Sequence, residues 1–286
     1  MKPFDALRRR LRWPSASMVV AAVALFIAIG GGAYAAATIN GHNIQNGTVD
    51  ESKLTAAARA RVDHSAGNHW GVIDRNTIGS AVADLRAGPY GSFGVTGSSA
   101  QPPFGVGSLG LQVSDNAMSG GTPQEKVAFG NEVDFLGNPV SGLTRVGFRV
   151  FQTQENADIS ASNMPNIALE INPQTGSSYT TMVWVPDPAP VTNKWSPFIS
   201  AVSTGQWYFT GSAGTATGCD QTTMCSFSGA KSALAAAQVG GTPASIYTIA
   251  IAKGRDDAWV GAVDGLRINN NVYNFEPYGV NTINAP

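Results

Sequence analysis

Apolar and polar residues alternate with a period of two in many short runs between residues 67 and 286. Such alternation is typical of β-strands that bury one face and expose the other. The clearest runs are Val146/Phe148/Val150, Ile167/Leu169/Ile171, Tyr179/Thr181/Val183/Val185 and Ile246/Thr248/Ala250. Shorter candidate strands are Ser108–Ser114, Glu125–Phe129, Gln206–Thr210, Trp259–Ile268 and Val272–Glu276. We expect residues 167–171 and 246–250 to be the central strands.

Turn-forming residues separate these runs, and helical periodicity is rare. The breakers are Gly-Asn-Pro at 137–139, Asn-Pro at 172–173, Pro-Asp-Pro at 186–188 and Gly-Gly at 240–241. A single helix is predicted over Ser228–Val239, with Ser228 as its cap and Gly240 as its stop. Without βαβ alternation, the pattern predicts an all-β fold, an antiparallel jelly-roll-like β-sandwich that forms one domain over residues 67–286.

The N-terminus has the pattern of an export signal. Five basic residues precede Met18–Ile29, an unbroken apolar run, and Ala33-Tyr34-Ala35 matches the small-residue pattern that signal peptidase cleaves. We expect residues 1–35 to be a signal peptide that is cleaved after Ala35. The alternative is retention, with residues 18–37 as a membrane anchor. Both alternatives place the rest of the chain outside the cytoplasm.

Residues 36–66 form a polar spacer with an unusual repeat. Ile39, Ile44, Val49 and Leu54 recur at every fifth position, a spacing found in square β-helices. Four such units are too few to cover their own ends, because repeat structures need several stacked units. We therefore interpret residues 36–66 as a spacer, which could also pack on a partner.

Composition and charge exclude several classes of protein. Charged residues are 13% of the chain, about half of the usual share, and 33 Gly and 16 Pro disfavour long helices or coiled coils. The net charge is −1, and it becomes −5 once residues 1–35 are removed, because they hold five basic residues and one acidic residue. No nucleic-acid partner is expected from this balance.

The two cysteines, Cys219 and Cys225, are close in the sequence. They lack the ligand number of a metal site and the spacing of a C-x-x-C redox motif. In an oxidising compartment they are expected to form a local disulfide, with two free thiols as the alternative.

Side chains suited to catalysis are few. The three histidines, His42, His64 and His69, lie in the spacer or at the first strand, and no G-x-S-x-G elbow occurs. A glycosidase needs two carboxylates, and the candidates are Glu132, Asp134, Glu170, Asp256, Asp257, Asp264 and Glu276. No spacing marks any two of them as a pair. No organic cofactor is expected, and a calcium ion is a weak candidate for Asp256, Asp257 and Asp264.

Aromatic residues are the better candidates for binding, because sugar rings stack their C–H faces on Trp and Tyr. If the face of Val183 and Val185 is core, alternation places Trp184 on the outer face. Tyr208 likewise opposes Trp207. The candidate ligand-binding residues are Trp184, Tyr208, Gln206 and Glu170.

Several short motifs of this chain resemble a family of exported bacterial surface domains of actinobacterial type, with a jelly-roll or concanavalin-like fold. The matching segments are Met18–Gly41, Pro102-Pro103-Phe104-Gly105-Val106-Gly107-Ser108-Leu109, Ile167-Ala168-Leu169-Glu170-Ile171-Asn172, Val263-Asp264-Gly265-Leu266-Arg267-Ile268 and Tyr273-Asn274-Phe275-Glu276-Pro277, with Trp195 and Trp207. The resemblance implies a two-sheet sandwich at the cell surface or in the medium. One departure is Asn172–Gly176, where relatives carry an Asp-rich turn, and it argues against calcium there.

The expected function is therefore binding outside the cell, with a glycan or cell-wall polymer as the partner. One alternative is a structural envelope or matrix component that associates with copies of itself. Another is a glycan-active hydrolase that uses two of the carboxylates. The membrane is a partner only through an uncleaved N-terminal segment.

Overall fold

The computed structural model describes residues 69–284, except 115–117, 120–121 and 189–190, together with residues 15–23, 25 and 53. Contacts divide the chain into two units, residues 1–59 and 60–286. In the first unit, residues 16–23 are helical. The cleavage site at Ala35 and most of the spacer lie outside the described residues. Every helix in the described part of the chain is too short or too polar to span a bilayer.

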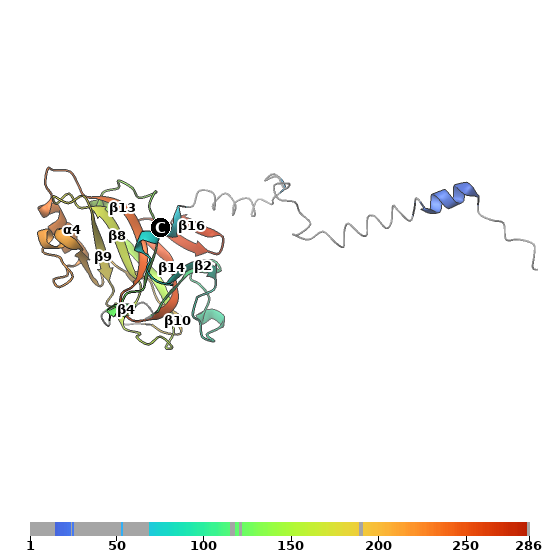
Figure 1. Ribbon diagram of the computed structural model, residues 1–286, viewed down its shortest axis with the longest axis horizontal. Helices are drawn as coiled ribbons and strands as arrows, with labels where there is room; N and C mark the ends of the chain where they lie inside the picture. Colours follow the sequence, from blue (N-terminus) through green and yellow to red (C-terminus); the bar gives the residue numbers. More distant parts are fainter. Residues whose placement is uncertain are drawn as a thin grey trace, which may run out of the picture. The chain divides into compact units, whose positions relative to one another are not determined.

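The second unit is a β-sandwich of two antiparallel sheets (Figure 1). The first sheet, in spatial order, contains β1 (Trp70–Val72), β6 (Lys126–Asn131), β13 (Ser245–Gly254), β8 (Asn166–Asn172), β9 (Thr180–Val185) and β12 (Gln206–Phe209). The prediction that residues 167–171 and 246–250 form central strands is confirmed, because β8 and β13 lie at the middle of this sheet. We call it the six-stranded sheet.

The second sheet is built around β14 (Trp259–Ile268), which pairs with three other strands. Its other members are β2 (Val82–Ala87), β3 (Gly107–Val113), β7 (Val146–Gln152), β10 (Lys194–Trp195), β11 (Ile199–Ser200), β15 (Asn271–Glu276) and β16 (Gly279–Asn284). A separate short hairpin pairs β4 (Met118–Ser119) with β5 (Thr122–Pro123). Short 3-10 turns are η3 (Asp74–Asn76), η4 (Gly97–Ser99), η5 (Val140–Gly142) and η6 (Ala161–Asn163).

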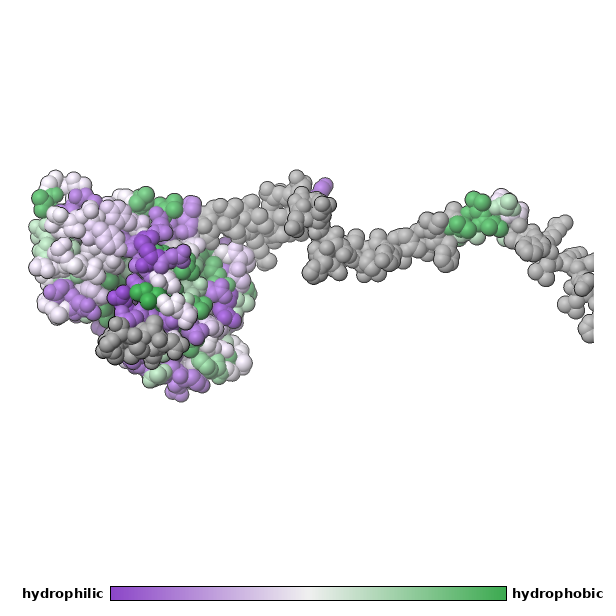
Figure 2. All heavy atoms as spheres, viewed as in Figure 1, coloured by the Kyte–Doolittle hydropathy of each residue, from purple (hydrophilic) through white to green (hydrophobic). Residues whose placement is uncertain are grey.

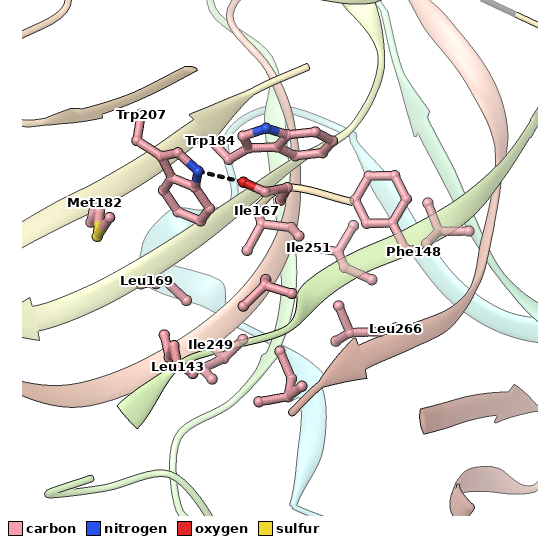
Figure 3. Close-up of a cluster of buried hydrophobic side chains, with 14 of the residues drawn as sticks. Leu143, Phe148, Ile167, Leu169, Met182, Trp184, Trp207, Ile249, Ile251 and Leu266 are labelled. Atoms are coloured by element: carbon pink, nitrogen blue, oxygen red, sulfur yellow. Dashed lines mark hydrogen bonds between the residues drawn. The ribbon is translucent and has the colours of Figure 1, made fainter. Parts of the chain in front are cut away.

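The core lies between the two sheets. Ile167, Leu169 and Ile249 from the six-stranded sheet are fully buried, as are Phe148 and Leu266 from the other sheet (Figure 3). Strand alternation places these side chains on the inner faces, where burial of apolar area stabilises the fold by about 25 cal/mol per Å². On the outside, hydrophilic and hydrophobic residues are interspersed over the visible face of the sandwich (Figure 2).

Two tryptophans of the core have satisfied ring N–H groups. Trp207 Nε1 donates to the Ala201 carbonyl at 2.7 Å (Figure 3), and Trp184 Nε1 donates to the Thr204 carbonyl at 2.9 Å. An unpaired ring N–H in this position would destabilise the fold. These bonds fix the loop between β11 and β12 against the core.

Two helices, α3 (Gly211–Thr217) and α4 (Phe227–Ala237), follow β12. The predicted helix is thus present, but its cap is Ser226, whose Oγ accepts the Gly229 N–H at 3.1 Å. The buried side of α4 joins the core, with the Phe227 ring centroid 5.2 Å from that of Trp207. Helix α4 therefore packs on the inner side of β12, beside Trp207.

The predicted disulfide is confirmed. Cys219 and Cys225 are bonded to each other, and they join the segment after α3 to the start of α4. Cys225 also exchanges two backbone hydrogen bonds with Trp207, at 2.7 and 2.9 Å. The disulfide therefore holds the connection between the two helices beside β12.

Candidate binding surface

The outer face of the six-stranded sheet contains a hollow of about 270 Å³. Strand register places Tyr208, Val183, Ala168, Ala250 and Gly130 in one line across five strands. The middle of this line has small side chains, while its β12 end has a large one. The hollow is therefore a direct consequence of Ala and Gly at outward-facing positions of central strands.

The edge of the hollow near β1 is fixed by tight packing. Ile73, which follows β1, packs on Ala128 and Ala250 and is fully buried. A Cβ atom at Gly130 would lie 2.6 Å from the Ile249 carbonyl oxygen and 2.8 Å from Ile73 Cδ1. A larger residue at position 130 would therefore displace Ile73 from Ala128 and Ala250.

A hydrogen-bonded network around Glu170 forms one wall of the hollow. Glu170 is only 2% exposed, and it accepts hydrogen bonds from Asn76 Nδ2 at 2.8 Å and from the Tyr179 hydroxyl at 2.7 Å. Arg75 donates to Glu170 and also to Glu132. Burial raises the pKa of Glu170, but the hydrogen bonds from Tyr179, Arg75 and Asn76 outweigh it and hold the pKa below its ordinary value. Glu170 is therefore ionised at neutral pH.

The opposite wall carries positive charge. Lys126 on β6 pairs in register with Gly254, and Arg255 follows directly in the turn after β13. Among the described residues, neither side chain has an ion-pair or hydrogen-bond partner. Burial and the nearby charge of Arg255 both lower the pKa of Lys126, while Glu170 opposes them. The two cations therefore lie close enough to repel each other.

A third cationic side chain in this region, Lys253, is already neutralised. The Lys253 ammonium group is buried and donates to Asn163 Oδ1 at 2.8 Å and to the Asp256 carboxylate. Burial lowers the pKa of Lys253, and Asp256 opposes that change. Lys253 is therefore part of the wall's structure, and Lys126 and Arg255 supply its available charge.

Two polar groups of the hollow also have no partner among the described residues. Asn166 Oδ1 is buried without a hydrogen bond, although Asn166 lines the hollow. The Tyr208 side chain also lines the hollow, and no hydrogen bond of its hydroxyl is present within the described part of the chain. A buried acceptor without a donor costs about 1–3 kcal/mol, which a ligand hydroxyl would recover.

Two of the predicted ligand-binding residues, Tyr208 and Glu170, line this hollow, and a third, Gln206, is exposed on the outward-facing side of β12. The prediction for Trp184 needs correction. Trp184 is 0% exposed and packs edge-on against Phe148 with a centroid distance of 5.7 Å. The physical reason is that Val183 faces the hollow, which reverses the assumed sides of β9.

The three calcium candidates do not form a common site in the described part of the chain. Asp256 pairs with Lys253, and Asp264 accepts the backbone N–H groups of Phe104 at 3.0 Å and Phe275 at 3.2 Å. The described residues contain no group of three His, Cys, Asp or Glu side chains able to hold a metal ion, which leaves Asp257 outside any such group. The structure thus gives Asp256 and Asp264 structural partners.

Asp264 and Glu276 instead join segments that are far apart in the sequence. Glu276 accepts the Val106 N–H at 3.1 Å and the Asn274 amide at 2.9 Å. A Cβ atom at Gly107 would lie 2.7 Å from the Glu276 backbone. The segment 102–109 and the two C-terminal motifs are therefore one packed unit on the second sheet.

A larger hollow, of about 550 Å³, lies beside the turn between β14 and β15. Two of its polar side chains, Asn269 and Asp134, are occupied by the protein itself. Asn269 Oδ1 accepts the Thr144 N–H at 2.8 Å, its Nδ2 donates to the Gly142 carbonyl at 3.1 Å, and Asp134 binds His69 and Asn131. Volume alone favours this larger hollow as the binding site. The available hydrogen-bonding groups favour the hollow on the six-stranded sheet instead.

Sequence reasoning missed Lys126, Arg255, Asn166 and the Arg75–Asn76 pair. Lys126 and Asn166 could have been found from the sequence. Lys126 shares a strand face with Ala128, and Asn166 shares one with Ala168 and Glu170. Arg75 and Asn76 lie in η3, outside any strand, so no periodicity connects them with Glu170. Their position depends on the pairing of β1 with β6.

No protein-family model matches the chain, and no curated protein or solved structure matches it either. The fold defines the class of the second unit, an antiparallel β-sandwich with a hollow on one sheet. Its function is therefore inferred from the geometry and charge of that hollow.

Proposed function

We propose that this chain is an exported β-sandwich protein that binds a saccharide in the hollow of the six-stranded sheet. The observation that carries the proposal is the combination of Tyr208, a floor of alanines and polar groups without protein partners. Sugar-binding sites need an apolar surface for the C–H face of the ring and hydrogen-bonding groups for its hydroxyls. The hollow offers both.

The volume of the hollow favours one sugar unit of a longer chain. Ligand pockets usually enclose about 300–1,000 Å³, and this hollow of about 270 Å³ lies just below that range. In the proposed complex, the ring lies against the partly exposed Ala168, beside Tyr208. Asn166 and Asn76 then bind hydroxyls at either side.

The cellular setting is also part of the proposal. The basic and apolar pattern of residues 1–35 supports export, and residues 36–66 support a spacer that places the sandwich at the cell surface. A jelly-roll-like connectivity is supported by the pairing of strands distant in sequence, such as β6 with β13 and β3 with β14. The proposed partner is then a glycan or cell-wall polymer.

The hydrolase alternative has less support from this geometry. A glycosidase needs one carboxyl group that stays protonated to act as the acid. Glu170 and Glu132 share Arg75, and the pKa of Glu170 is lowered. An ionised carboxylate with three donors already bound is a structural group rather than a proton donor.

The test is binding of the purified full chain to an array of bacterial cell-wall and other polysaccharides. We expect at least one saccharide to be retained, and Tyr208→Ala to weaken its binding at least tenfold. Phe93→Ala is the matched control, because Phe93 is 53% exposed and does not line the hollow. Retention of no saccharide, with concentration-dependent assembly in sedimentation, would instead favour the self-associating envelope component.

A further inference from the structure

We infer that the bound saccharide is acidic and that Lys126 and Arg255 bind its anionic group. Asn166 Oδ1 then accepts a hydrogen bond from one of its hydroxyls. This inference rests on the proposed function and names the class of sugar that the hollow takes. A uronic acid, which carries a carboxylate on the sugar ring, is the simplest member of that class.

The first observation is a pair of like charges without counterions. Lys126 and Arg255 both line the hollow, and the charge of Arg255 is one cause of the lowered Lys126 pKa. No acidic side chain among the described residues forms an ion pair with either. Lys126 is partly buried and Arg255 is exposed beside it, so solvent screens their repulsion only in part, and an anion between them would remove it.

The remaining charged groups of the hollow do not supply this anion. Glu170 is the acidic group that Lys126 senses, but its oxygens accept hydrogen bonds from Arg75, Asn76 and Tyr179. Asp256 is bound to the buried Lys253. Glu170 and Asp256 are therefore both engaged by other groups of the protein.

The second observation is independent of charge. Asn166 Oδ1 is a buried acceptor that lacks a donor. A carboxylate has no hydrogen to donate, so a simple anion would leave this oxygen unpaired. A sugar acid meets both requirements, because it presents an anionic group and hydroxyl donors on one ring.

The third observation is the apolar floor between the cations and Tyr208. Ala128, Ala168, Ala250 and Ala252 all line the hollow. Ile73 already covers Ala128 and Ala250, while Ala168 and Ala252 are partly exposed. A phosphate or sulfate ion would leave this surface exposed to water. The ring of a sugar would cover it with C–H groups, and Tyr208 would lie beside the ring.

The experiment compares matched acidic and neutral ligands by calorimetric titration of the full chain. The probes are oligomers of galacturonate, glucuronate and mannuronate, each tested beside its methyl ester, which keeps the ring but removes the charge. We expect at least one oligouronate to bind at least tenfold more tightly than its ester. We also expect its affinity to fall as salt is raised, because the interaction is ionic.

Two variants locate the interaction. Lys126→Gln and Arg255→Gln are each expected to weaken oligouronate binding at least tenfold and to change binding of the ester less than twofold. Lys194→Gln is the matched control, since Lys194 is exposed on β10 of the other sheet. Thermal unfolding of each variant shows whether the fold is retained.

The outcomes separate the two levels of the proposal. Equal affinity for acids and esters, with both variants unaffected, would overturn the acidic ligand and leave saccharide binding in place. Absence of binding to every saccharide tested, including the array, would overturn both.

Discussion

Carboxylates in this protein act mainly as acceptors for groups of the protein itself. Glu170 accepts from three side chains, and Glu125 accepts from the backbone and side chains of Ser80 and Ser114. Both have a pKa below the ordinary value, because these hydrogen bonds outweigh the effect of burial. The pKa of Asp264 is instead raised, because its complete burial outweighs the backbone N–H groups that it accepts.

The pH dependence of stability follows from Asp264. Burial raises the pKa of Asp264 to about 7, although backbone N–H groups of Phe275, Gly265 and Phe104 oppose it. The folded state therefore binds more protons than the unfolded state between about pH 4 and pH 7. We expect the contribution of Asp264 to the free energy of unfolding to decrease as pH rises through that interval, as measured by urea denaturation of the parent beside Asp264→Asn.

The Asp264→Asn variant is expected to lose this pH dependence. Asp84→Asn is the control and is expected to keep it, because Asp84 is exposed on β2. Should the variant fail to fold, the carboxyl carbon shift of Asp264 in the unmodified protein gives the same information by NMR titration. A titration midpoint near 4 would contradict the effect of burial.

The helical element beside β12 depends on its covalent link. Helix α3 has seven residues and α4 has eleven, lengths at which isolated helices are marginal in water. Their stability therefore comes from packing of Phe227, Ala230 and Leu234 on the core and from the Cys219–Cys225 disulfide.

Replacement of both cysteines by serine is expected to destabilise the fold by about 2 kcal/mol, the loop-entropy value for so small a ring. Buried Cys219 adds to this loss, because serine is more polar at that position. Urea denaturation of the double variant beside the parent measures the change. Equal stability of the two would show that packing alone holds α3 and α4.

At the scale of the whole molecule, the sequence predicted the strands that contribute most to the core. Strands β7 and β8 were found because their apolar residues alternate over five positions. Strand β13 was found from Ile246/Thr248/Ala250, but a bulge after Ile246 puts Ile246 in the core and Ala250 on the outer face. The short strands β1 and β10, and the exposed edge strand β16, were missed because they have too few buried residues to produce a period. The all-β sandwich was predicted from the many short alternating runs, the turn residues between them and the absence of βαβ alternation.

The candidate site was predictable only in part. Glu170 and Tyr208 were found because each opposes core residues on its strand. Trp184 was misplaced because both faces of β9 carry large apolar residues, so alternation does not indicate which face is buried. The positive wall depends on the pairing of β6 with β13, which brings Lys126 to the turn that holds Arg255, and no sequence period records that pairing.

The most direct measurement is NMR of the alanine methyl groups of the full chain during titration with an oligouronate. Ala168, Ala250 and Ala252 form the floor of the hollow, whereas Ala236 is exposed on α4. We predict saturable shifts of the first three methyl signals and none for Ala236. Saturable shifts confined to residues outside the hollow, or unchanged floor signals at ligand concentrations that saturate binding, would contradict the assignment of the binding site.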